Sequence, residues 1–210
     1  MFQRLKEINC RLTIFDLQIR EDYFMGITIY YKGNLNNADK RKETVDTIKY
    51  IGETAEWEVN IIDERKKNLY GAVLQVHEEC DPLPFLFDST GRLRSLFWLA
   101  GYASDDDLWT FTKTQFAGFE AHIIIIKFLD FIKKNFISDL EVKDDTDYWT
   151  HRNSLILQKN FRQTDFLISS FGKMLSSEKF DFSAENTEIL VKKIENAFEE
   201  LFNRIKKKIR

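Results

Sequence analysis

Short segments rich in β-branched and aromatic residues fill the first half of the chain and predict β-strands. Residues 57–63 (WEVNIID) and 69–77 (LYGAVLQVH) carry this pattern, and the charged run between them is typical of a hairpin loop. Strands with similar signals are expected at residues 11–20, 24–31, 84–87, 92–99 and 108–113. Residues 34–50 are ambiguous, but apolar residues recur there at three-residue intervals and favour a helix.

Longer segments with helical spacing fill the second half. Residues 117–136 are apolar on nearly every side in the middle, where four consecutive isoleucines run from Ile123 to Ile126. This pattern predicts a central helix that is buried on most sides. A short strand is expected at residues 139–143, a second helix from Thr150 or Asn153 to about Leu175, and a last helix from Ser183 or Asn186.

Together these elements predict an α+β protein. We expect an antiparallel β-sheet in the N-terminal half, with the largely buried central helix and two further C-terminal helices packed on it. The change from strands to helices divides the chain into a β-rich half, 1–115, and a helical half, 116–210. The two halves are expected to form one compact domain, with separate subdomains as the alternative.

Composition narrows the class of protein. The chain has 210 residues, of which 43% are hydrophobic and 31% charged, as in ordinary soluble proteins. Its net charge of -3 is unlike the basic field of DNA-binding proteins, so nucleic acid is not an expected partner. Cys10 and Cys80 form no disulfide framework, and neither a signal peptide nor a membrane-spanning apolar run is visible. A cytoplasmic protein is expected, without a membrane association.

Glu120 and His122 stand directly before the isoleucines, at the edge of a region that is expected to be dry. If this segment is extended, Glu120 and His122 share a face, and together with Lys113 and Gln115 they predict a polar site for an anion or substrate at a helix N-terminus. If it is helical, Glu120 and His122 point about 200° apart. In that case Glu120 favours the helix start and His122 is a hydrogen-bonded core histidine.

Acidic residues beside aromatic ones suggest an interaction loop. The members of this loop are Asp144, Asp145, Asp147, Tyr148, Trp149 and Arg152. Aromatic and arginine side chains dominate the energetics of protein interfaces, which favours a contact role. The alternative is an acidic turn that starts a helix, with Trp149 anchoring it to the core. Asp105 to Asp107 form a second acidic loop.

Metal-binding and catalytic signals are weak. His77 and Glu79 share a face of a strand, with Cys80 next to them, but no second pair of ligands has the spacing of a zinc site. The alternative is a strand that ends in a polar turn. No phosphate-binding loop, nucleophile elbow or dinucleotide fingerprint is present, so no cofactor is expected. Basic residues 204–210 are a possible contact for nucleic acid or anionic lipid.

A series of short motifs runs from about Thr112 to Trp149. They are Lys113-Thr114-Gln115, Ala117-Gly118, Glu120, His122, Leu140-Glu141-Val142, Asp144-Asp145 and Tyr148-Trp149. With these motifs the chain resembles a family of uncharacterised bacterial proteins. Phe119 stands where that family often has proline, and residues 150–153 differ from its Glu-Thr-Gly-Asp. The resemblance implies a bacterial origin and brings no established activity.

These observations lead to two functional hypotheses. The first is a non-enzymatic protein that binds another protein, immunity- or antitoxin-like, whose acidic loops cover a basic partner. The second is a metal-dependent hydrolase in which His77, Glu79, Glu120 and His122 converge, with His151 as a further candidate. Whether the protein is an enzyme is left open by the sequence.

Overall fold

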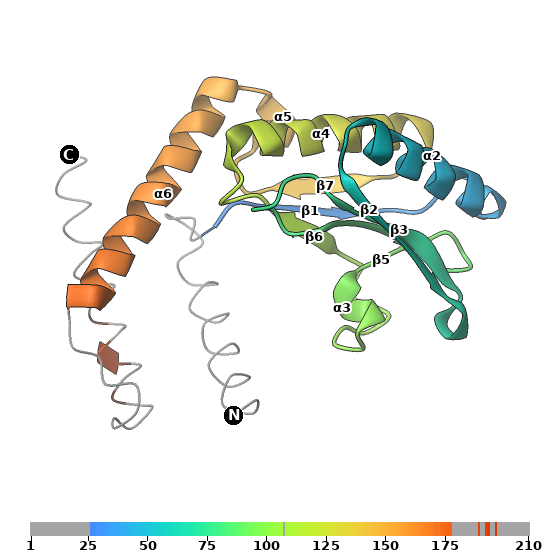
Figure 1. Ribbon diagram of the computed structural model, residues 1–210, viewed down its shortest axis with the longest axis horizontal. Helices are drawn as coiled ribbons and strands as arrows, with labels where there is room; N and C mark the ends of the chain where they lie inside the picture. The colour runs from blue at the N-terminus through green and yellow to red at the C-terminus, as the bar shows by residue number, and fades with distance from the viewer. Residues whose placement is uncertain (1–25, 107, 178–188, 190–191, 194–195, 197–210) are drawn as a thin grey trace. The chain divides into compact units, whose positions relative to one another are not determined.

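The computed structural model describes residues 26–106, 108–177, 189, 192, 193 and 196 (Figure 1). The strand predicted at 11–20, most of the last predicted helix and the basic end 204–210 lie outside the described residues. The chain divides into two compact units, one of Ile19–Phe161 and one of Met1–Gln18 with Arg162–Arg210. Every described strand lies in the first unit, and two antiparallel sheets with helices confirm the α+β class.

The first sheet has three antiparallel strands in the order β6-β1-β7. They are β1 (Thr28–Lys32), β6 (Thr110–Lys113) and β7 (Glu141–Asp144). Alternation along β1 places Ile29 and Tyr31 in the core, both with no exposed surface, whereas Tyr30 and Lys32 are on the opposite face and are half-buried. The strand predicted at 139–143 thus joins the sheet from the second half of the sequence.

The second sheet has four antiparallel strands in the order β2-β3-β4-β5. They are β2 (Glu58–Glu64), β3 (Leu69–Gln75), β4 (Leu83–Phe87) and β5 (Leu93–Arg94). The predicted hairpin is confirmed: β2 and β3 are joined by a 3-10 turn, η2 (Arg65–Lys67), and by Asn68 in the left-handed conformation, with φ 49°. All five residues of β4 are buried, as a continuous apolar strand requires.

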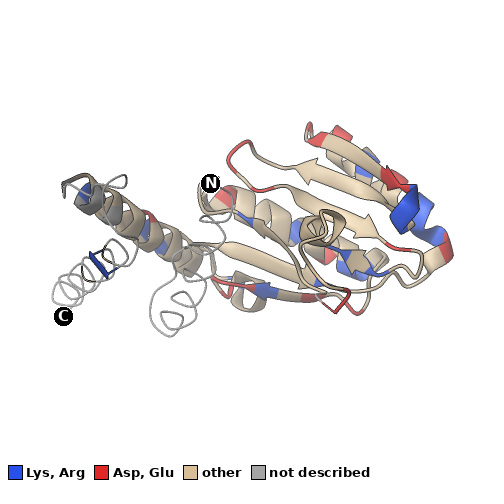
Figure 2. Cartoon of the chain, turned by 90° about the horizontal axis from the view of Figure 1, so that it is seen from below, with Lys and Arg blue, Asp and Glu red and all other residues tan. Residues whose placement is uncertain are grey.

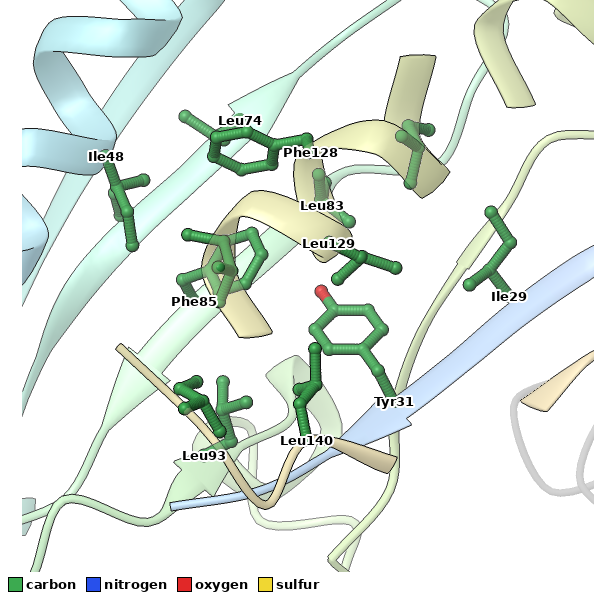
Figure 3. Close-up of a cluster of buried hydrophobic side chains, with 14 of the residues drawn as sticks. Ile29, Tyr31, Ile48, Leu74, Leu83, Phe85, Leu93, Phe128, Leu129 and Leu140 are labelled. Atoms are coloured by element: carbon green, nitrogen blue, oxygen red, sulfur yellow. The ribbon is translucent and has the colours of Figure 1, made fainter. Parts of the chain in front are cut away.

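The backbone that follows β1 connects the two sheets. The Leu93 amide donates to Gly33 O at 3.0 Å and the Leu35 amide donates to Gly91 O at 2.8 Å. The buried Tyr31 hydroxyl also crosses between the sheets, donating to Pro84 O at 2.7 Å. One main hydrophobic core therefore spans both sheets (Figure 3).

Two helices supply the other side of this core. They are α2 (Arg41–Thr54), which follows a 3-10 turn, η1 (Ala38–Lys40), and α4 (Gly118–Asn135). In Figure 1 both lie on one side of the sheets, and α3 lies on the other. Ile125, Ile126 and Leu129 of α4 have no exposed surface, and neither do Val45 and Ile48 of α2.

The central helix is less enclosed than its isoleucines predict. Ile125 and Ile126 are fully buried, but Ile124 is 45% exposed. With 3.6 residues per turn, Glu120, Ile124 and Lys127 form an outward stripe, and both charged residues are exposed. The helix is therefore buried where it faces the sheets and where Ile123 packs on Leu157 and Phe161, but it is open to solvent along this stripe.

The strand predicted at 92–99 is also wrong beyond its first residues. Only Leu93–Arg94 form β5, and Leu96–Leu99 form a short helix, α3. The Ser95 side chain accepts a hydrogen bond from the Trp98 amide at 3.1 Å and so caps this helix. A local cap outweighs the alternating pattern here.

The end of the first unit is helical. After the one-turn helix α5 (Tyr148–His151), α6 runs over Ser154–Ser177, close to the predicted second helix. Its residues Leu157 and Phe161 form a small buried cluster with Ile27, against which Ile123 packs. No helix within the described residues is long and apolar enough to cross a membrane.

Candidate functional site

His122 lies fully buried on α4 and connects three segments of the chain. Its Nδ1 is 2.8 Å from the Thr114 hydroxyl, which follows β6. Its Nε2 is 3.3 Å from Asp144 Oδ2, at the end of β7, and 3.4 Å from the Thr146 hydroxyl. The side chains of His122 and Asp144 are both 0% exposed, so this contact joins helix to sheet inside the protein.

Asp144 also holds the turn that follows β7. Its carboxylate accepts hydrogen bonds from the Thr146 amide and hydroxyl, each at 2.8 Å, and from the Trp149 amide at 2.9 Å. Burial by itself raises the pKa of Asp144, but the hydrogen bond and attraction from His122, with the bonds from Thr146, hold that pKa below its usual value. The ionised carboxylate is thus the form that fits this site.

Threonine, histidine and aspartate in hydrogen-bonded series are also the groups of nucleophilic catalysis. Here Thr114, His122 and the Asp144 side chain have no exposed surface, and no substrate reaches the hydroxyl. The arrangement acts as a structural link between elements. It corresponds to the alternative in which His122 is a hydrogen-bonded core histidine.

The four residues of the predicted polar site do not assemble. Glu120 is exposed in the first turn of α4, whereas His122 points into the core. Lys113 pairs with Thr28 and shares the outer face of the first sheet with it, and Gln115 is buried at 2% exposure. The segment is helical from Gly118, so the shared face expected for an extended chain is absent.

The predicted interaction loop is largely built into the protein. Asp144 is unavailable to a partner because its side chain is buried, and Asp145 accepts a hydrogen bond from the Thr28 amide at 3.1 Å. Tyr148 and Trp149 are half-buried and pack against the main core. Asp147 is exposed, with a left-handed φ of 57°.

Arg152, the last member of that loop, is exposed and engaged on the surface of the same unit. Its guanidinium lies 4.7 Å from the centre of the Trp149 ring and donates to Asp130 at 2.8 Å. The loop therefore matches the alternative of a turn that starts a helix and is anchored by Trp149.

His77 and Glu79 lie in a turn after β3. The His77 Nδ1 accepts a hydrogen bond from the Glu79 amide at 3.1 Å, and Gln75 donates to the carbonyls of His77 and Cys80. His77 is exposed while His122 is buried, so the convergence expected of a hydrolase is not found. Within the part of the chain that the structure describes, no three His, Cys, Asp or Glu side chains are placed to hold a metal ion.

The other acidic segment belongs to a loop that buried charges hold in place. Residues 95–106, called the anchored loop below, include α3 and follow Arg94 directly. The Arg94 side chain is 8% exposed and donates to Asp88 at 2.9 Å and to the Asp105 carbonyl at 3.0 Å. Burial alone raises the pKa of Asp88, but hydrogen bonds from Thr90 and Arg94 lower it below its usual value.

Trp98 fastens the same loop from the other side. Its indole Nε1 donates to Asp105 Oδ1 at 2.7 Å, and the Arg94 guanidinium lies 4.8 Å from its ring centre. Lys67 reaches across from the β2–β3 turn, donating to the Leu99 carbonyl at 2.7 Å. The loop backbone is thus held at the C-terminal end of α3 and again at Asp105.

The anchored loop presents aromatic and acidic groups to solvent. Phe97 is 51% and Tyr102 74% exposed, and the Asp105 side chain is 80% exposed. Asp106 is exposed as well. Sequence reasoning identified the acidic residues but missed the two rings, whose only signal was the dense aromatic content around a capping serine.

The comparisons with known proteins found no match: the chain matches no protein-family model, no curated protein and no solved structure. The resemblance to a bacterial family over residues 112–149 therefore stays a prediction.

Proposed function

We propose that this protein binds another protein through the anchored loop, as a non-enzymatic, immunity- or antitoxin-like partner. The observation that carries the proposal is a pair of exposed rings, Phe97 and Tyr102, on a loop fastened by the buried Arg94–Asp88 ion pair. The bacterial and cytoplasmic setting expected from the sequence belongs to the same proposal.

Large exposed rings on a held backbone are suited to protein recognition. Aromatic side chains supply much of the free energy of protein interfaces, and their few rotatable bonds limit the entropy lost on binding. A loop that is already held by Arg94, Trp98 and Lys67 loses less conformational entropy when a partner covers it. These features support a preformed contact surface.

Charge favours a basic partner. Asp105 and Asp106 are exposed beside the rings, and carboxylates around an aromatic centre attract and orient a positively charged protein. Asp105 keeps most of its surface exposed although it also contacts Trp98.

The test is affinity capture from a lysate of the source cells with the whole protein as bait. Tyr102→Ala removes the most exposed ring of the anchored loop. Tyr50→Ala is the matched control, because Tyr50 is 69% exposed on α2, outside the loop. A basic protein should be retained by the wild type and by Tyr50→Ala.

Binding of that protein to Tyr102→Ala should be weaker by about 30-fold, the effect of losing roughly 2 kcal/mol at an interface hot spot. Calorimetry or surface plasmon resonance with the purified pair measures the difference. If no basic protein is captured, or if the two tyrosine variants bind it equally, the proposal fails.

A further inference from the structure

The outer face of the first sheet gathers lysines and aromatic rings. Strand register places Tyr30 opposite Phe111 of β6 and Lys143 of β7, so these three side chains share one face. The lysines and rings of this face, called the lysine–aromatic face, are Tyr30, Lys32, Trp109, Phe111, Lys113 and Lys143. Thr28 and Glu141 share the face with them, opposite Lys113 and Lys32 respectively. The opposite face carries the buried Ile29 and Tyr31 and is covered by α4.

Two lysines from neighbouring strands meet over a single ring. The ammonium of Lys32 lies 4.8 Å and that of Lys143 lies 4.7 Å from the centre of the Trp109 ring. Tyr30 and Phe111 lie alongside, with ring centres 5.9 Å apart, and Phe97 stacks on Phe111 at 5.6 Å. Positive charge and π-faces are therefore interleaved on one surface.

The face carries an excess of positive charge. Lys32 is paired with Glu141 at 3.1 Å. Within the part of the chain that the structure describes, Lys113 and Lys143 make no ion pair, and Lys143 is exposed. The chain's net charge of -3 therefore does not describe this surface. Figure 2, in which Lys and Arg are blue and Asp and Glu are red, shows that segments of both signs are spread along the described chain.

We infer that the lysine–aromatic face binds single-stranded nucleic acid. Lys113 and Lys143 suit the phosphates, since counterion release makes such contacts favourable. Trp109 and its neighbouring rings suit unpaired bases, which stack on aromatic side chains. A duplex keeps its bases stacked inside and gains only from the lysines, so the rings favour a single strand. This inference does not rest on the protein partner proposed for the anchored loop, although Phe97 of that loop borders the face through Phe111.

The test is a fluorescence-anisotropy titration of the whole protein with a labelled oligouridine about 15 nucleotides long, beginning at about 50 mM salt. Lys143→Gln removes one charge from the face and leaves a polar side chain only one atom shorter. Lys127→Gln is the matched control, because Lys127 is exposed on α4, which covers the opposite face. Phe97 is left unchanged, since it also belongs to the anchored loop.

The expected result is that the logarithm of the binding constant falls linearly with the logarithm of the salt concentration. Lys143→Gln should make that slope shallower by about 0.7, the value for one phosphate contact on a single strand, and Lys143→Arg should restore it. Lys127→Gln should leave the slope unchanged. Trp109→Leu should weaken binding by roughly tenfold, as expected for a lost stacking platform. Circular dichroism checks the fold of each variant.

Four results would overturn the inference. The first is absence of binding at about 50 mM salt, and the second is an equal effect of Lys127→Gln and Lys143→Gln. The third is binding of a matched duplex as tight as that of the single strand. The fourth is competition by polyglutamate that is as effective as competition by the oligonucleotide. The last result would assign the face to an acidic protein. If Trp109→Leu does not fold, the lysine variants still decide.

Discussion

Asp144 and Asp88 each carry a charge into a region with little water, and each is stabilised by several donors. His122, Thr146 and the Trp149 amide surround Asp144, whereas Arg94 and Thr90 surround Asp88. Such clusters matter because a buried carboxylate that loses one partner costs much more free energy than an exposed one.

The lowered pKa of Asp144 makes stability depend on acid. Its carboxyl binds a proton at lower pH in the folded protein than in the unfolded chain, whose pKa is near 3.8. Stability from this group is therefore complete above about pH 5 and is lost as pH falls through the folded pKa. In urea unfolding, the free energy of unfolding should decrease as the pH is lowered from about 6 to about 3.

Asp144→Asn tests the assignment, because asparagine does not ionise. Its fall in stability with acid should be shallower than that of the wild type, and at neutral pH it should be less stable by roughly 3 kcal/mol, since a buried pair is broken. Asp130→Asn, at an exposed pair with Arg152, is the control and should change stability by less than about 1 kcal/mol. Equal acid profiles for wild type and Asp144→Asn would contradict this account.

The contact between His122 and Asp144 could not be predicted from the sequence. Glu120 and His122 were expected to belong together because they are neighbours in sequence, yet the partner of His122 is Asp144, from a segment assigned to a different site. Nothing in either segment encodes that pairing. It depends on how α4 crosses the sheet, which local patterns do not determine.

Local signals were sufficient for most elements. The β2–β3 hairpin, β4 and β6 follow from apolar runs bounded by charged or turn residues, and α2 and α4 follow from helical spacing. The error at residues 92–99 arose because a few alternating residues resemble a strand, while one hydrogen bond to Ser95 starts a helix. Exposure of Ile124 was missed because four isoleucines in a row conceal the periodicity of α4.

Gly71 illustrates how closely β3 and β4 approach. A methyl group added to Gly71 would meet the Phe85 carbonyl and lie 2.6 Å from Leu86 Cα, both of which belong to the backbone of β4. Gly71→Ala should therefore lower the free energy of unfolding by about 1–3 kcal/mol or more, because backbone cannot move aside as a side chain does.

Thermal or urea unfolding measures this change, with Gly172→Ala as the control. Gly172 is on α6, and among the described residues nothing lies within 4 Å of an added methyl group, so alanine there should be neutral or stabilising by up to about 1 kcal/mol. An equal response of the two variants would mean that the contact between β3 and β4 is looser than described.

At the scale of the whole molecule, the division between strands and helices does not follow the sequence order. The helix α2 lies before residue 115, and β7 lies after it and pairs with β1. Pairing of β1 with both β6 and β7 is a long-range choice, since these strands are far apart in the chain. For this reason the order of the strands could not be predicted from the sequence, although the class of fold could.

Hydrogen exchange should reveal the same organisation. Amides of β1 and β3 are flanked by strands on both sides, and those of α4 line the core, so they should exchange slowest. Amides of α3 should exchange faster by several orders of magnitude, because opening free energies run from near zero at the periphery to a global value of roughly 5–15 kcal/mol. Equal protection of α3 and β1 would contradict the proposed core.

Residues 28–35 have a mechanical consequence for the protein. This one stretch of backbone is bonded to β6 and β7 along its first part and to residues 91–93 along its second. The two sheets are therefore joined by one continuous backbone segment, and not by hydrogen bonds alone. A force that pulls the two sheets apart is borne by the covalent backbone of this segment. The edge strand β2 should therefore detach from β3 before the two sheets separate.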